Sequence, residues 1–168
     1  MADPAITIRR LQPDDAESYR AIRLEGLEHH PEAFGASFED EAAQSLDWFA
    51  ERLRSRGVFG AFRDGELVGV AGFYPYAGAK ARHKGVLWGM YVRPSARGTG
   101  AARALVERVV EQARQHVELL HLTVVRTNDR ARRLYARTGF TEYGVETHSL
   151  KVGDQYFDEV LMVRDVTR

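Results

Sequence analysis

The sequence contains no cysteine in its 168 residues, and this absence removes several kinds of chemistry at once. Without a thiol there is no disulfide framework, no cysteine nucleophile and no thiolate metal site. A charge bias is also missing, because Lys plus Arg and Asp plus Glu number 24 each and the net charge is zero. Zero net charge argues against a protein that binds nucleic acid by neutralising phosphates. We therefore expect no nucleic-acid partner.

Long apolar runs are missing as well, and from the first residues we expect no secretory leader. No stretch approaches the roughly 20 apolar residues that a membrane-spanning helix needs, so we expect no membrane partner. Residues 1–4 hold an acid and a proline where a signal peptide has basic and apolar residues. Of six histidines only His29 and His30 are neighbours, and no second cluster with metal-ligand spacing follows. These observations predict a cytoplasmic protein without a metal site.

The length and the hydrophobic patterns predict a single α/β domain over residues 1–168. Residues 5–11 alternate as a strand does, and residues 16–29 have helical spacing. Gly85 and Gly89 weaken the strand that ends before Arg93, and a β-bulge is the expected reason. The other expected elements are helices at 40–54, at 101–115 and between Asn128 and Gly139, and strands at 58–62, 67–74, 119–125, 140–152 and 155–163.

Residues 87–102 are expected to form a strand, then a turn and then the start of a helix, and the functional interpretation depends on this stretch. The first part is rich in large and β-branched residues, as buried strands are, and Pro94 ends it. Gly98 and Gly100 then precede two alanines that begin a helix. Unpaired N–H groups in a first helical turn, together with the helix dipole, bind phosphate groups through the backbone alone. The stretch therefore predicts an anion site, although an ordinary strand-to-helix turn would use the same glycines.

Two familiar phosphate loops fail at specific positions of this stretch. A Walker loop needs Lys and Ser or Thr where Ala101 and Ala102 stand, and a dinucleotide fingerprint needs a small residue in place of Arg103. The pattern that matches is Arg-x-x-Gly-x-Ala, formed by Arg97, Gly100 and Ala102. This pattern resembles the pyrophosphate loop of the GNAT superfamily of acyl-CoA-dependent N-acyltransferases.

A second ordered motif downstream resembles the same superfamily. Residues 124–140 contain a strand followed by Asn128, Ala131, a Leu-Tyr pair at Tyr135, and Gly-Phe at Phe140. The two motifs cover about a third of the chain. The resemblance implies a GNAT-like α/β (α+β) fold: a mixed, mostly antiparallel sheet of six or seven strands, with a splayed parallel central pair and about four flanking helices.

The resemblance also implies acetyl-CoA as co-substrate. In the superfamily, backbone groups of the splayed strand pair with the pantetheine arm, and the glycine loop binds the pyrophosphate. Asn128 matches the superfamily's asparagine at the cofactor arm, although an N-cap role explains it as well. The cofactor-binding residues implied in this way are Met90, Tyr91, Val92, Arg97, Gly98, Thr99, Gly100, Ala101, Ala102 and Asn128.

Tyr135 stands where the superfamily has a tyrosine that protonates the departing thiolate, seven residues after Asn128. A simple packing role for the aromatic ring is the alternative. Many members carry an acid on the splayed strand as general base, but Val86, Leu87 and Trp88 stand in that neighbourhood here. The proton must then go to another group or to water, and the sequence leaves open four side chains: Glu25, Glu28, His83 and Asp158.

The resulting hypothesis is an N-acetyltransferase that moves an acetyl group from acetyl-CoA directly to a primary amine. The acceptor, a small molecule or a peptide, is not identified by the sequence, and a homodimer is left open. The rival hypothesis is a non-catalytic CoA-binding or sensor domain, which would keep the phosphate loop and lack the acid and the base. A structural α/β domain without a ligand is a more distant rival.

Overall fold

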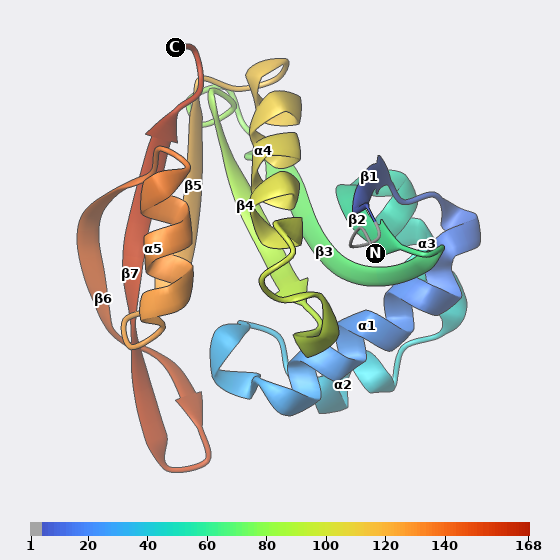
Figure 1. The fold of residues 1–168 in the computed structure, drawn as a ribbon. Coiled ribbons are helices and arrows are strands. Elements are labelled where there is room, and N and C mark those ends of the chain that lie inside the picture. Colours follow the sequence, from blue (N-terminus) through green and yellow to red (C-terminus); the bar gives the residue numbers. More distant parts are fainter. Residues whose placement is uncertain (1–4) are drawn as a thin grey trace.

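A computed structural model describes residues 5–168, and the described part forms one seven-stranded sheet (Figure 1). Residues 1–4, on which the expectation of no secretory leader rests, lie outside it. The strand order is β1-β2-β3-β4-β5-β7-β6, and all neighbours are antiparallel except the parallel pair β4 and β5. The strands are β1 (Thr7–Arg10), β2 (Gly57–Arg63), β3 (Glu66–Pro75), β4 (Lys84–Val92), β5 (Leu119–Val125), β6 (Thr141–Val152) and β7 (Gln155–Asp165). The predicted fold class is confirmed.

Five α-helices and three short 3-10 helices accompany the sheet within the described residues. Across that same part of the chain, no helix is both long and apolar enough to cross a bilayer. The α-helices are α1 (Ala16–His29), α2 (Phe38–Ala42), α3 (Leu46–Ser55), α4 (Ala101–Arg114) and α5 (Asp129–Arg137). The 3-10 helices are η1 (Pro13–Asp15), η2 (Pro31–Ala33) and η3 (Pro94–Ala96).

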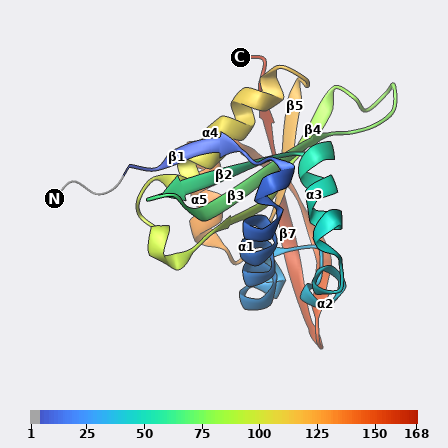
Figure 2. The same cartoon turned by 90° about the vertical axis from the view of Figure 1, so that its right-hand side faces the viewer.

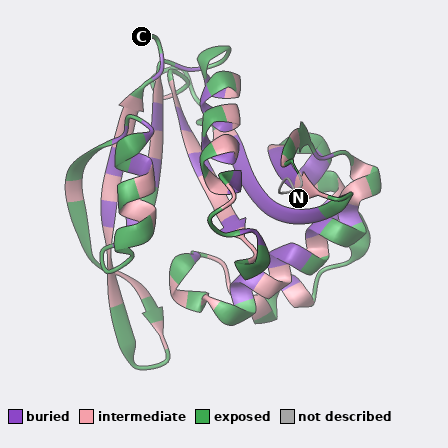
Figure 3. Ribbon diagram, in the orientation of Figure 1, coloured by how far each residue is buried: buried purple, intermediate pink, exposed green. Residues whose placement is uncertain are grey.

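Helices cover both faces of the sheet, and Figure 2 shows β2 and β3 between α4 and α1. Successive residues of β2 point to opposite faces, as the strand period requires. Phe59 therefore joins the core cluster under α4, while Val58 joins the cluster under α1 and α3. Figure 3 shows the buried residues running along β3 between these helices. Burial on both faces makes the centre of the sheet a rigid support for the strands beside it.

The single helix expected at residues 40–54 is wrong, because the chain forms α2 and α3 there with a break between them. Ser45 explains the break. Its backbone is extended, and its hydroxyl accepts a hydrogen bond from the N–H of Trp48 at 3.2 Å, which caps a new helix. The periodic pattern of apolar residues continues across Ser45, so the pattern alone did not indicate the break.

The predicted bulge lies in β4 at Gly89. Two residues of β4, Gly89 and Met90, face the single residue Ala71 of β3, and Gly89 has a φ of 63°. The prediction for Gly85 is wrong, because its pairing is regular. A Cβ at Gly85 would lie 2.6 Å from the ring of Phe73, so close packing explains that glycine.

The parallel strands β4 and β5 separate partway along their length. They pair only over residues 84–86 and 119–121, although β4 continues to Val92 and β5 to Val125. Figure 1 shows the two strands diverging from the end near α4's C-terminus. Backbone N–H and C=O groups beyond the last pair have lost their neighbouring strand, so they are available to an extended ligand.

Candidate active site

A cleft of about 870 Å³ opens where β4 and β5 separate. Its walls come from residues 87–92 of β4, residues 123–125 of β5, helix α5 and two loop segments. These segments are residues 96–98 and 100–103 at the start of α4, and residues 30 and 32–34 after α1. Val124 belongs to the core under α4, whereas Thr123 is exposed and its side chain alternates to the opposite face. The cleft therefore joins the two faces of the sheet.

The glycine loop forms one end of the cleft. Gly98 and Gly100 have φ values of 78° and 85°, and Gly100 is the N-cap of α4. These left-handed conformations favour glycine, and the first residues of α4, Ala101 and Ala102, line the cleft beside them. The first backbone bond of this turn runs from Ala104 to Gly100, which leaves the N–H groups before it without a helical partner.

The space beside this loop is open. A Cβ on either Gly98 or Gly100 would meet no atom within 4 Å. Arg97 and Arg103 line the same end of the cleft, and Arg103 also pairs with Glu107 at 2.7 Å. Of the loop residues predicted to bind the cofactor, Thr99 does not line the cleft. Its hydroxyl donates to the carbonyl oxygen of Ala96 at 2.5 Å and so fixes the turn.

Strand β4 lines the cleft with Met90, Tyr91 and Val92, three of the residues predicted to bind the cofactor. The hydroxyl of Tyr91 is buried and has no hydrogen-bond partner with good geometry among the described residues. Burial, together with the nearby carboxylate of Glu25, raises the pKa of Tyr91 to about 12. Glu25 is itself held by Arg93 at 3.1 Å.

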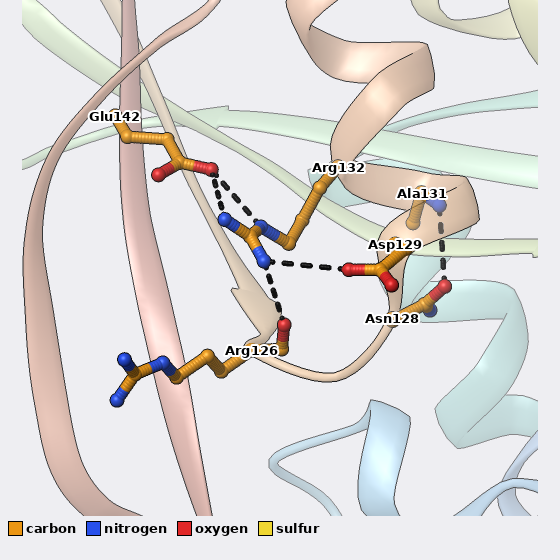
Figure 4. A network of polar contacts seen from close by, with 6 residues as sticks. All are labelled: Arg126, Asn128, Asp129, Ala131, Arg132 and Glu142. Atoms are coloured by element: carbon orange, nitrogen blue, oxygen red, sulfur yellow. Dashed lines mark hydrogen bonds and ion pairs between the residues drawn. The ribbon is translucent and has the colours of Figure 1, made fainter.

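Asn128 lies at the turn between β5 and α5 and also lines the cleft. Its side-chain oxygen accepts the N–H of Ala131 at 3.2 Å, which confirms the predicted N-cap (Figure 4). Arg132 braces the same turn by donating to the carbonyl oxygen of Arg126 at 2.9 Å and to Glu142 at 2.8 Å. The turn is thus rigid, and its cleft-facing groups are fixed in place.

Tyr135 extends from α5 into the cleft wall, and only 5% of it is exposed. Its ring packs edge-on against Phe140, with centroids 5.9 Å apart. The hydroxyl forms no hydrogen bond with any described residue. Burial raises the pKa of Tyr135 well above that of a free phenol, so the O–H stays protonated and is available as a donor.

The four side chains left open as proton acceptors do not line the cleft: Glu25, Glu28, His83 and Asp158. His83 precedes β4, at the end where β4 and β5 are still paired. Asp158 accepts a hydrogen bond from the N–H of His148 at 2.8 Å. Glu25 lies behind Tyr91 and is paired with Arg93. A proton acceptor inside the cleft must therefore come from elsewhere.

Two side chains that the sequence interpretation missed line the cleft. Within the described residues, His30 and Glu32 are the histidine and the acid that line the cleft. Nδ1 of His30 lies 3.7 Å from Oε1 of Glu32, and the His30 ring lies 6.0 Å from that of Tyr91. They reach the cleft because η2 contacts both β5 and β6. The sequence around His30 contains no local signal that predicts this long-range contact.

Comparison with known proteins agrees with the geometry of the cleft. A family model described as "Acetyltransferase (GNAT) family" matches residues 23–140, which is most of the chain. The chain belongs to the GNAT family. The family model and the N-acetyltransferase relatives together show an acyl-CoA-dependent acetyltransferase. The predicted enzyme class is therefore confirmed.

Individual GNAT relatives resemble the chain in sequence and in fold. An uncharacterized N-acetyltransferase of Mycobacterium tuberculosis is 35% identical over 135 residues, covering 78% of this chain and 81% of its own. A GNAT acetyltransferase from Streptococcus pneumoniae superposes with a TM-score of 0.84 at 22% identity, covering 96% and 99% of the two chains. A Salmonella typhimurium protein described as an acetyltransferase with its cofactor acetyl-CoA has a TM-score of 0.80 at 20% identity, covering 98% and 95%.

Proposed function

We propose that this GNAT protein moves an acetyl group from acetyl-CoA directly to a primary amine, and that residues 1–168 act as one catalytic domain. The observation that carries the proposal is the cleft between β4 and β5, which brings the glycine loop, an unpaired strand edge and Tyr135 together. The Salmonella typhimurium neighbour, whose structure contains acetyl-CoA, supports the choice of acyl donor.

In this proposal the loop binds the pyrophosphate through the N–H groups at the start of α4. Gly98 and Gly100 let the phosphates approach the backbone, and Arg97 adds a positive charge. The pantetheine arm lies along the unpaired edge of β4 at Met90 and Val92, in the way that a peptide adds to a sheet edge. Asn128 contacts this arm from the opposite side through the groups that its capping role leaves unused.

Acetyl-CoA supplies a thioester whose carbonyl carbon is attacked by the amine. Transfer is direct and needs no covalent enzyme intermediate, which agrees with a sequence that has no cysteine. The departing sulfur needs a proton, and the O–H of Tyr135 lies in the wall of the cleft to donate it. Its raised pKa means that the hydroxyl carries its proton at neutral pH.

The attacking amine must lose a proton, and His30 is our proposed acceptor. His30 is 40% exposed at the rim of the cleft, so the proton can pass on to solvent. Glu32, 3.7 Å away, stabilises the imidazolium that forms. This assignment gives the GNAT cleft the base that β4 does not carry.

A CoA-release assay against a panel of amines tests the proposed function. The panel contains amino acids, polyamines, aminoglycosides and peptides with free N-termini. We expect the release of CoA thiol to depend on at least one amine, with an acetylated product of the matching mass. Tight binding of acetyl-CoA without transfer to any amine would instead support the non-catalytic sensor.

A further inference from the structure

Three arginine side chains surround the cleft residue Trp88 on the face of β4 that packs against α1 and α3. The Cζ atoms of Arg23, Arg52 and Arg56 lie 5.4, 5.3 and 5.2 Å from the centre of the indole ring. Trp88 itself lines the cleft. One wall of the acetyl-transfer site is therefore backed by a cluster of positive charge, which we call the Trp88 arginine cluster.

Acidic side chains balance only part of this charge. Glu41 of α2 is buried between two of the arginines, with 2.8 Å to Nε of Arg23 and 2.9 Å to Nη1 of Arg52. Burial alone would raise the pKa of Glu41, but the two guanidinium groups outweigh it and lower that pKa. Glu41 is thus ionised and offsets one charge. Arg56 forms no ion pair within residues 5–168, so the Trp88 arginine cluster keeps a positive excess.

Arg23 does not itself line the cleft, but it has an unused donor directly behind Gly89, which does. The residue is 6% exposed, and its Nη1 atom is buried without a hydrogen-bond partner in the described part of the chain. A Cβ on Gly89, the bulge residue that lines the cleft, would lie 3.4 Å from this Nη1. A buried donor without a partner and an unbalanced buried charge both destabilise a protein. An anion bound at this wall would relieve both.

We propose that the amine acceptor carries a carboxylate close to its amine, and that Arg23 and Arg56 bind this carboxylate beside Trp88. This inference rests on the acetyltransferase function proposed above and names its substrate class. Guanidinium groups match carboxylates in geometry and form charge-assisted hydrogen bonds with them. The same positive excess repels acceptors that carry several ammonium groups, such as polyamines and aminoglycosides. The acceptor class is therefore that of amino acids and related amino carboxylates.

Arg23 and Arg56 have different roles in binding the carboxylate. Arg23 is fixed by its paired contacts with Glu41, and its Nη1 lies next to the bulge residue Gly89. Arg56 is exposed and stacks on Tyr74 at 5.0 Å, at the outer side of Trp88. A carboxylate bound between the two arginines would keep the neighbouring amine close to the part of β4 where it separates from β5.

Matched acceptors test this inference. The kcat/KM for acetyl transfer is measured with a set of L-amino acids, with their carboxamides and with the corresponding decarboxylated amines. We expect each amino acid to exceed its carboxamide by about tenfold or more, the scale of a charge-assisted contact to a carboxylate. In Arg56→Gln this ratio falls toward one, while calorimetric binding of acetyl-CoA is unchanged. The control Arg54→Gln, an exposed residue of α3 paired with Glu51, keeps the wild-type ratio.

The outcomes separate this inference from the function beneath it. Equal kcat/KM for amino acids and carboxamides overturns the carboxylate site and leaves the acetyltransferase intact. An equal loss on both members of each pair in Arg56→Gln also overturns it, because a merely structural arginine would act in that way. Absence of transfer to every acceptor overturns the proposed function and this inference with it.

Discussion

Nδ1 of His30 lies 3.7 Å from Oε1 of Glu32 at the rim of a cleft that contains a buried tyrosine, Tyr135, in its wall. In the proposed mechanism these residues are the two ends of a proton path: His30 accepts the proton of the amine and Tyr135 donates to the departing thiolate. His30 lies next to η2, which contacts β5 and β6, whereas Tyr135 comes from α5.

Replacing His30 by Gln should slow the chemical step by about 10²-fold, the usual scale for a positioned proton acceptor. The loss should appear in the single-turnover rate with the acceptor amine at saturation, while binding of acetyl-CoA stays close to that of the wild type. His29→Gln is the matched control, since His29 is adjacent and does not line the cleft. A single-turnover rate in folded His30→Gln equal to that of the wild type would remove His30 from the mechanism.

Replacing Tyr135 by Phe keeps the ring and removes the hydroxyl. We expect the single-turnover rate to fall by about 10²-fold or more while acetyl-CoA binding stays close to that of the wild type. The melting temperature should change little, because the hydroxyl has no hydrogen bond to lose among the described residues. A folded Tyr135→Phe enzyme with full single-turnover activity would show that this residue only packs against Phe140.

Alkaline pH should destabilise the protein partly through Tyr91. Burial and Glu25 raise its pKa to about 12, so the folded protein keeps a proton that the unfolded chain releases near pH 10. Its contribution is fully present below pH 10 and is lost as pH rises from 10 toward 12, by about 1.4 kcal/mol per pH unit at most. Urea unfolding at pH 9 and pH 11 measures the loss. It should be smaller in Tyr91→Phe and unchanged in Tyr143→Phe, whose ring is exposed; equal losses in all three proteins would contradict this assignment.

The buried carboxylate of Glu41 should be important for stability. Glu41→Gln leaves Arg23 and Arg52 without their shared negative charge, and breaking such a buried pair costs about 3–5 kcal/mol. Chemical denaturation measures this loss. Glu51→Gln, which breaks an exposed pair with Arg54, should cost no more than about 1 kcal/mol. Similar losses in the two variants would mean that the contacts between α1, α2 and α3 do not depend on Glu41.

Much of the fold was predictable because its signals are local. Pro94, the two loop glycines and the alanines after them determine the end of β4 and the start of α4 from neighbouring backbone preferences alone. Asn128 behaves in the same way, since an N-cap acts within three residues. β5 was predicted over its full length because most of its residues are apolar, although Thr123 is exposed and the strand is not buried on both faces throughout.

The parts that sequence reasoning missed depend on distant contacts. His30 was noted only as a neighbour of His29, and its role follows from the contact of η2 with β5 and β6. His83 was a candidate because it directly precedes β4. It lies at the end where β4 is still paired with β5, away from the cleft. The Trp88 arginine cluster brings side chains from α1 and α3 into contact with β4. Residue spacing in the sequence does not predict that contact.

Binding of acetyl-CoA to Gly100→Val, measured by calorimetric titration, tests the central claim most directly. Gly65→Val is the matched control, because Gly65 lies in the β2–β3 turn with a φ of 80°, against 85° at Gly100, and a Cβ at either position meets no atom within 4 Å. Both variants carry the same backbone strain, of about 1–2 kcal/mol. We predict that Gly65→Val binds acetyl-CoA as the wild type does and that the folded Gly100→Val loses affinity by at least about 10²-fold, since only its side chain occupies the pyrophosphate site. Wild-type affinity in a folded Gly100→Val protein would show that the loop is a turn and that the cleft does not bind acetyl-CoA in this way.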